Sequence, residues 1–254
     1  MEHVNNKVVQ ETSPWFKNWF DSPHYHQLYA NRDEGEAQQF IDALLGALQP
    51  ARNASMIDVG CGAGRHAKYL SSKGYTVTGI DTAGSSIQQA KRFQSPSLCF
   101  HQHDMRVPFG KSSYDYVFNF FTSFGYFEGL HENYTVVQNM ADAIKQKGTI
   151  VIDYLNVGYA EERLVAEESK QISGIIYYIK RWADNTHFYK KIIIDDQFSQ
   201  PFEYVEKVAK FTISDFRYMF YCYDLRLVEI YGDYQLSPYS IINSPRLIMI
   251  VKKS

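Results

Sequence analysis

The stretch that decides the fold runs from Met56 to His66 and reads Met-Ile-Asp-Val-Gly-Cys-Gly-Ala-Gly-Arg-His. An apolar strand leads directly into glycines that open a helix, so the backbone can approach a bound ligand without a Cβ in the way. The glycines have the spacing G-x-G-x-G, which is tighter than the G-x-G-x-x-G of dinucleotide sites. Asp58 precedes them on the strand, and its carboxylate suits a ligand with an amino group better than an anionic pyrophosphate. The segment therefore predicts a cofactor-binding loop.

Two further acids follow the next two expected strands. Asp81 ends the run GID, seventeen positions after Gly64, where a carboxylate can accept both hydroxyls of a ribose. By itself Asp81 would be interpreted as a helix or turn cap, but its register with the glycine loop favours the ribose. Asp104 lies in the run HDM at the end of the third expected strand, where it can accept from an adenine amino group. Alone it is a typical turn residue, so its assignment depends on the other two.

Short apolar strands alternate with helices along the middle of the chain. The expected strands span 55–59, 75–80, 98–102, 114–120 and 149–154, and the expected helices span 64–72, 85–93 and 133–144. Short buried strands separated by helices pair in parallel through right-handed crossovers. Two more strands are expected at 225–231 and 246–252. We therefore expect an α/β, Rossmann-like three-layer sandwich with a seven-stranded sheet, six strands parallel and the last antiparallel.

The chain divides into three expected regions. Residues 1–48 form an N-terminal helical lid segment, which contains an aromatic stretch at 15–20 and an amphipathic helix at 35–48. Residues 49–155 and 212–254 form the Rossmann-like core, and residues 156–211 form an antiparallel β insertion. In the insertion a helix at 161–169 is expected before strands at 175–182, 188–195 and 204–211. Ser214 is the expected cap of a helix at 214–223.

The successive runs DVGCGAG, GID, HDM and YDYVFNFFTSFGYF resemble, in this order, the motifs of class I S-adenosylmethionine-dependent methyltransferases. The resemblance covers residues 55–154 and is closest to bacterial small-molecule methyltransferases with an FTSFGYF-like segment and a C-terminal antiparallel insertion. It implies the cofactor S-adenosylmethionine, the product S-adenosylhomocysteine, and N- or O-methylation of a small acceptor.

The resemblance also implies roles for single residues. In such families the glycine loop holds the methionine part, the acid after the second strand binds ribose, and the third-strand acid and its neighbour hold adenine. Arg65 is expected to touch the methionine carboxylate, with a place on the helix surface as the alternative. The expected cofactor-binding residues are Asp58, Gly60, Gly62, Gly64, Arg65, Asp81, Asp104, Met105, Asn119 and Phe120.

The acceptor is expected on the far side of the methyl group. Aromatic residues at 119–127 would face the sulfonium, because an aromatic face attracts positive charge, although core packing explains some of them. The catalytic candidates are Tyr25, Tyr29 and Tyr126, and the acceptor-binding candidates are Arg32, Phe124, Arg181, Tyr239 and Arg246. For Arg181, Tyr239 and Arg246 an ordinary strand surface is the competing interpretation.

Other chemistries have less support. The run NFFT at 119–122 lacks both prolines of the [DN]-P-P-[YFW] motif of amino-methylating nucleic-acid enzymes. Asp153 and Asn156 could suggest a metal-dependent catechol type, but companion ligands are not evident, so no metal is expected. No Tyr-x-x-x-Lys pair supports an NAD(P)-linked oxidoreductase at the expected place. The intact loop disfavours a catalytically silent S-adenosylmethionine-binding protein.

The composition limits the partners. The chain of 254 residues has a net charge of -2, which gives no general attraction to nucleic acid. No apolar run approaches the roughly 20 residues that span a bilayer, and the N-terminus does not read as a secretory signal. The three scattered cysteines suggest no disulfide framework. We expect a cytoplasmic monomer or homodimer that acts on a small molecule, not on nucleic acid or a membrane.

Overall fold

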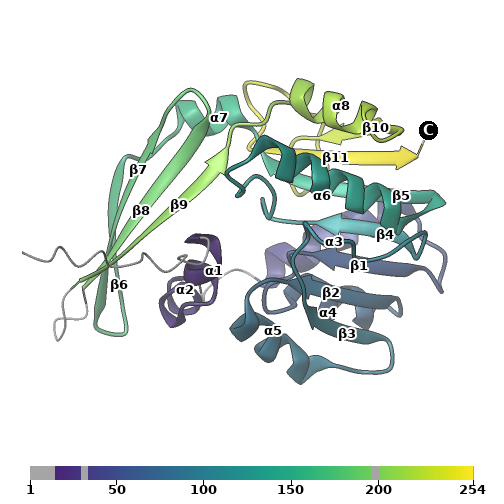
Figure 1. Ribbon diagram of the computed structural model, residues 1–254, viewed down its shortest axis with the longest axis horizontal. Coiled ribbons are helices and arrows are strands. Elements are labelled where there is room, and N and C mark those ends of the chain that lie inside the picture. The colour runs from purple at the N-terminus through teal and green to yellow at the C-terminus, as the bar shows by residue number, and fades with distance from the viewer. Residues whose placement is uncertain (1–14, 30–33, 196–200, 254) are drawn as a thin grey trace, which may run out of the picture.

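The computed structural model describes residues 15–29, 34–195 and 201–253, and its centre is a seven-stranded mixed sheet (Figure 1). The strand order is β3-β2-β1-β4-β5-β11-β10. Strands β1 to β5 pair in parallel, whereas β11 is antiparallel to both of its neighbours. This confirms the expected sheet. The strands are β1 (Ser55–Val59), β2 (Thr76–Asp81), β3 (Leu98–Gln102), β4 (Tyr114–Asn119), β5 (Ile144–Leu155), β10 (Leu225–Tyr231) and β11 (Arg246–Lys253).

Helices cover both faces of this sheet. On one face, α3 (Glu34–Leu48), α4 (Arg65–Ser72) and α5 (Gly84–Ala90), followed by the short 3-10 helix η1 (Lys91–Phe93), pack in one apolar cluster. On the other, α6 (Leu130–Ala143) and α8 (Ile213–Tyr221) pack in a second cluster. Side chains alternate along each strand, so Ile150 and Ile152 belong to one cluster and Val151 to the other. The central strands are therefore mainly apolar on both faces, as buried parallel strands are.

A separate four-stranded antiparallel sheet projects from the end of β5 (Figure 1). It follows α7 (Val157–Glu162) and consists of β6 (Glu167–Ile172), β7 (Ile175–Ala183), β8 (His187–Asp195) and β9 (Phe202–Ala209). We call it the insertion sheet. Together with the main sheet it confirms the expected fold class.

Two details of this region differ from the sequence prediction. The helix expected at 161–169 is wrong, because α7 ends at Glu162 and residues 167–172 form the edge strand β6. Ser173 and Gly174 have positive φ angles and reverse the chain, so β6 pairs with β7. The charged residues of β6 are typical of an exposed helix, but pairing with β7, a long-range interaction, makes this segment a strand. The cap of α8 is Thr212 rather than Ser214, in a capping box with Asp215.

The N-terminal helices α1 (Trp15–Phe20) and α2 (Pro23–Leu28) pack against the insertion sheet. Ser22 caps α2 by accepting a hydrogen bond from the His24 N–H at 3.2 Å, with Pro23 in the first turn. Trp19 is fully buried in a third apolar cluster, whose buried members are Trp19, Leu28, Tyr177, Ile179, Ile192 and Ile194. Figure 1 shows both helices between the insertion sheet and the core. No helix in the described part of the chain is long and apolar enough to cross a membrane.

Candidate active site

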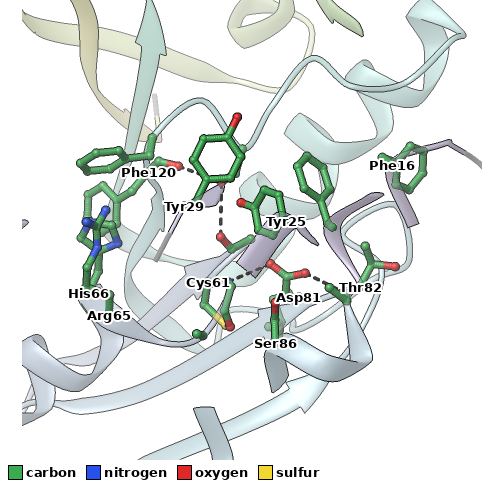
Figure 2. Close-up of a pocket in the computed structure, with 18 of the residues that line it drawn as sticks. Phe16, Tyr25, Tyr29, Cys61, Arg65, His66, Asp81, Thr82, Ser86 and Phe120 are labelled. Atoms are coloured by element: carbon green, nitrogen blue, oxygen red, sulfur yellow. Dashed lines mark hydrogen bonds between the residues drawn. The ribbon is translucent and has the colours of Figure 1, made fainter. Parts of the chain in front are cut away.

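A pocket of about 580 Å³ lies at the carboxyl ends of β1 to β4, beneath α1 and α2 (Figure 2). This is the edge of an open α/β sheet where ligands bind. Its walls come from the core, the N-terminal helices and, through Glu206 of β9, the insertion sheet. Its size lies in the range of small-molecule sites.

The glycine loop forms the floor of the pocket, and the surroundings and backbone angle of each glycine explain why a larger residue is disfavoured there. Gly60 has a φ of 78°, and a Cβ there would lie 2.6 Å from Cβ of Ser123. Gly64 has a φ of 83°, and a Cβ would lie 2.6 Å from the Phe100 ring. Gly62 has nothing within 4 Å of an added Cβ and lines the pocket. A side chain at Gly62 would occupy ligand space, and the φ of 54° at this position also favours glycine.

Asp81 is held at the end of β2 by the backbone around it (Figure 2). Its two carboxylate oxygens accept hydrogen bonds from the N–H groups of Gly62 and Ala83, both at 2.8 Å. Burial raises the pKa of Asp81, and these N–H donors oppose the rise. Each carboxylate oxygen can accept more than one hydrogen bond, so Asp81 can also bind hydroxyls in the pocket.

Asp58 lies beneath the loop and is almost fully buried. Among the described residues, neither of its carboxylate oxygens has a hydrogen-bond partner at ordinary distance. Burial, and next the negative charge of Asp81, raise the pKa of Asp58 to about 7, against the dipole of the Ala67 N–H and the charge of Arg65. A buried carboxylate of this kind has the chemistry to receive a cationic group of a ligand.

At the end of β3, Asp104 is bound to Arg106. Arg106 donates to both carboxylate oxygens, at 3.1 and 2.7 Å, and also contacts Glu132. Although burial opposes it, these hydrogen bonds hold the pKa of Asp104 below its usual value. The Arg106 guanidinium lies 4.9 Å from the ring centre of Phe127 and 5.5 Å from that of Phe16. An apolar wall with a fixed acid is thus present on this side of the pocket.

The opposite wall contains a strained turn. Phe121 and Thr122 have φ angles of 54° and 58°, a left-handed conformation that costs roughly 1–3 kcal/mol for each residue that is not glycine. The Arg65 guanidinium lies 4.6 Å from the ring centre of Phe121. The His66 ring lies 4.8 Å from Phe120 and 5.0 Å from Phe121. Of the residues in this wall, Arg65, His66, Phe120 and Phe121 line the pocket and Thr122 does not.

A methyltransferase-domain family model matches residues 57–152, which include the glycine loop, Asp81 and Asp104. Residues 57–152 therefore form a methyltransferase domain, and solved S-adenosylmethionine-dependent methyltransferases share the fold of this chain.

Individual relatives of this methyltransferase are distant. It is 21% identical over 201 residues to a ubiquinone biosynthesis O-methyltransferase of Rickettsia typhi, which covers 76% of each chain. A solved S-adenosylmethionine-dependent methyltransferase of Clostridium acetobutylicum has a TM-score of 0.75 at 14% identity, over 90% of this chain and 95% of that one. The sugar N-methyltransferase KedS8 of a Streptoalloteichus species has a TM-score of 0.72 at 15% identity, over 100% and 99%. The two structures show a shared fold.

The methyltransferase brings many of its expected site residues together around the pocket. These are Tyr25, Tyr29, Gly60, Gly62, Arg65, Asp81, Asp104, Met105, Phe120 and Tyr126. Asp58, Gly64 and Asn119 lie in the layer beneath, where the Asn119 side chain donates to the Val59 carbonyl at 2.7 Å.

The other acceptor candidates lie away from the pocket. Phe124 is fully buried against Phe216 of α8. Arg181 contacts Glu168 across the insertion sheet, and the Tyr239 hydroxyl donates to Asn156 at 3.2 Å. Arg246 is paired with Asp153. Arg32 lies outside the described residues. In the described part of the chain, no group of three or more His, Cys, Asp or Glu residues could hold a metal ion.

The insertion was expected to help bind the acceptor, but the residues by which it reaches the pocket are not those predicted from the sequence. Glu206 lines the pocket and accepts hydrogen bonds from Trp19 Nε1 at 2.6 Å and from the Tyr29 hydroxyl at 3.1 Å. Lys190 donates to the same hydroxyl and lies 3.7 Å from Glu206. Burial lowers the pKa of Lys190, and Glu206 opposes this. These residues are more than 150 positions apart from Tyr29, so no local pattern could have connected them.

Proposed function

We propose that this methyltransferase binds S-adenosylmethionine in the pocket above the glycine loop and transfers the methyl group to a nitrogen or oxygen of a small molecule. The observation that carries the proposal is the cavity of about 580 Å³, lined at once by the glycine loop, by Asp81 and Asp104, and by three tyrosines. One half of the cavity, with the glycine loop, Asp81 and Asp104, suits a nucleoside, and the other half is lined by the aromatic rings.

The residues fit the methyl donor. Gly62 leaves open the space that a Cβ would fill, and the buried carboxylate of Asp58 suits the amino group of the methionine part. Asp81 would accept from the ribose hydroxyls while it keeps its two backbone donors. Asp104 and Met105 would hold adenine beside the apolar wall of Phe16 and Phe127, and Arg65 would meet the methionine carboxylate. The donor supplies a methyl group already activated by a sulfonium, so the protein mainly positions the acceptor and excludes water.

The acceptor would enter between the N-terminal helices and the insertion sheet. Tyr25, Tyr29 and Tyr126 supply aromatic faces with polar ends, as in many small-ligand sites. Tyr29 donates to Glu206, so a proton that leaves the acceptor can pass to the Tyr29 oxygen as the phenolic proton moves to the carboxylate. The O- and N-methyltransferases among the similar proteins support an oxygen or nitrogen acceptor.

The test is transfer of label from methyl-labelled S-adenosylmethionine to an extract of the source cells, divided by ultrafiltration. We expect label in the small-molecule filtrate, with one S-adenosylhomocysteine formed for each methyl transferred, and much less label with Asp81→Ala at the same donor concentration. Label only in retained RNA or protein would overturn the small acceptor. Failure to bind S-adenosylhomocysteine and to transfer label to either fraction would overturn the whole proposal.

A further inference from the structure

The strained turn at Phe121 and Thr122 is held by two residues from neighbouring strands. The Asp153 carboxylate, at the end of β5, accepts from the Phe121 N–H at 2.8 Å, and the Asp153 carbonyl accepts from the Thr122 N–H at 3.0 Å. Arg246, at the start of β11, donates from Nη2 to Thr122 Oγ1 at 2.9 Å and from Nε to Asp153 at 2.7 Å. The N–H groups of both turn residues and the Thr122 hydroxyl therefore each have a specific partner.

The same network reaches the wall of the pocket through Tyr234. Its ring stacks on Phe121 with 5.0 Å between ring centres, and its hydroxyl donates to Asp153 at 3.2 Å. Phe121 in turn contacts the Arg65 guanidinium and the His66 ring. Asp153 is fully buried, and neither it nor Arg246 lines the pocket, whereas Phe121, Arg65 and His66 do.

If the Asp153–Arg246 ion pair served only to join β5 to β11, this arrangement would not be explained. The two strands already pair over seven residues by backbone hydrogen bonds. A buried ion pair is also a weak source of stability in itself. By contrast, left-handed backbone at two consecutive residues other than glycine persists only where the surroundings fix it, and such strain gathers at functional sites.

We propose that Asp153 and Arg246 are positioning residues for the cofactor pocket. They hold Phe121 and Thr122 in the left-handed turn, and the turn sets the Phe121 ring against which Arg65 and His66 are placed. This inference rests on the proposed function only in that the pocket takes S-adenosylmethionine. It gives Arg246 a role beneath the pocket wall instead of contact with the acceptor.

The first test compares the wild-type protein with the double variant Asp153→Asn/Arg246→Met, which removes both charges and so leaves neither buried alone. Calorimetric titration with S-adenosylhomocysteine is expected to give at least tenfold weaker binding, because the Thr122 anchor and the ion pair are both lost. A matched control is Asp115→Asn/Lys145→Met, which removes a 2.9 Å ion pair at the opposite end of the same sheet. The control should bind like wild type. Wild-type protein that does not bind would count against the proposed function, whereas a double variant that binds like wild type would overturn the positioning role.

A second comparison leaves the ion pair intact and separates positioning from mere support of the fold. Thr122→Val keeps the branched shape but loses the Oγ1 acceptor, so the strained turn loses its hydrogen bond from Arg246 and affinity should fall about fivefold. Thr122→Gly loses the same acceptor but adopts a positive φ without strain, so it should bind more tightly than Thr122→Val. Equal affinities, or weaker binding by the glycine variant, would overturn the proposal even if the double variant fails to fold.

Discussion

At the scale of single residues, the site depends on carboxylates whose neighbours decide their chemistry. Asp81 is held by two backbone donors, Asp104 by an arginine, and Asp58 by no ordinary hydrogen bond among the described residues. All three carboxylates are predictable from the sequence, because each lies at the end of a strand in a short run with its own spacing. It could not predict their different pKa shifts, since these depend on burial and on partners such as Arg106.

Replacing Asp81 with alanine should weaken S-adenosylhomocysteine binding by at least tenfold. The substitution removes charge-assisted hydrogen bonds to the ribose, each worth roughly 1.5–3 kcal/mol, and releases the N–H groups of Gly62 and Ala83. Calorimetry measures the affinity, and thermal melting checks that the fold survives. Asp115→Ala, at the start of β4, serves as the control. Undiminished affinity in a folded Asp81→Ala protein would show that the ribose binds elsewhere.

Asp58→Asn should make the unliganded protein more stable at pH 8. The folded pKa of about 7 lies above the ordinary 3.8, so ionisation favours the unfolded chain as the pH rises between these values. A difference of about three between the folded and unfolded pKa corresponds to a loss of about 4 kcal/mol in the free energy of unfolding. This loss is complete above pH 7 and absent below pH 4. Urea unfolding should therefore show a gain for the variant at pH 8 that disappears near pH 4. A gain of equal size at both pH values would rule out titration of Asp58 as its cause.

The same carboxylate should couple cofactor binding to pH. If the ligand's ammonium group binds Asp58 in its charged form, binding must first remove the proton that is present below the folded pKa. Wild-type affinity for S-adenosylhomocysteine should therefore rise from pH 6 to pH 8, by up to about tenfold per unit below pH 7. Calorimetry in matched buffers measures this, and Asp58→Asn should remove most of the slope. An unchanged slope in that variant would assign the effect to another group.

At the scale of elements, the N-terminal helices belong structurally with the insertion sheet. Trp19 is fully buried among Tyr177, Ile179 and Ile192, and its Nε1 donates to Glu206. The aromatic stretch predicted a segment that docks, but its docking surface is a strand face about 160 residues away. For the same reason the sequence indicates a helix at 161–169 where β6 begins, since only pairing with β7 defines β6 as a strand. The parallel core was predictable because its strands and helices each carry their own local periodicity.

Trp19→Ala should loosen the N-terminal helices from the insertion sheet. A buried Trp lost to Ala costs roughly 3–5 kcal/mol, which falls on the docking of α1. Limited proteolysis should cut the N-terminal segment faster, and S-adenosylhomocysteine affinity should fall because Phe16, Phe20 and Tyr25 line the pocket. Trp182→Ala, at a tryptophan 43% exposed on the same sheet, is the matched control. If both variants resist protease as wild type does, the docking carries no such energy.

At the scale of the whole molecule, one pocket unites three parts of the chain. The core contributes the glycine loop and its acids, the N-terminal helices contribute aromatic rings, and the insertion sheet contributes Glu206. The sequence predicted the first part well, since the loop and acids are local patterns at strand ends. The acceptor candidates chosen by type, such as Arg181 and Phe124, lie elsewhere, because only the path of the chain determines which side chains meet.

The most direct measurement of the central claim is a crystal structure of the protein with S-adenosylhomocysteine. We expect the ligand in the pocket of Figure 2, with both ribose hydroxyls within hydrogen-bond distance of the Asp81 carboxylate and adenine beside Asp104 and Met105. The sulfur should point toward Tyr25, Tyr29 and Tyr126, with space left for an acceptor. A ligand bound outside this pocket, or bound within it without contact to Asp81, would contradict the account.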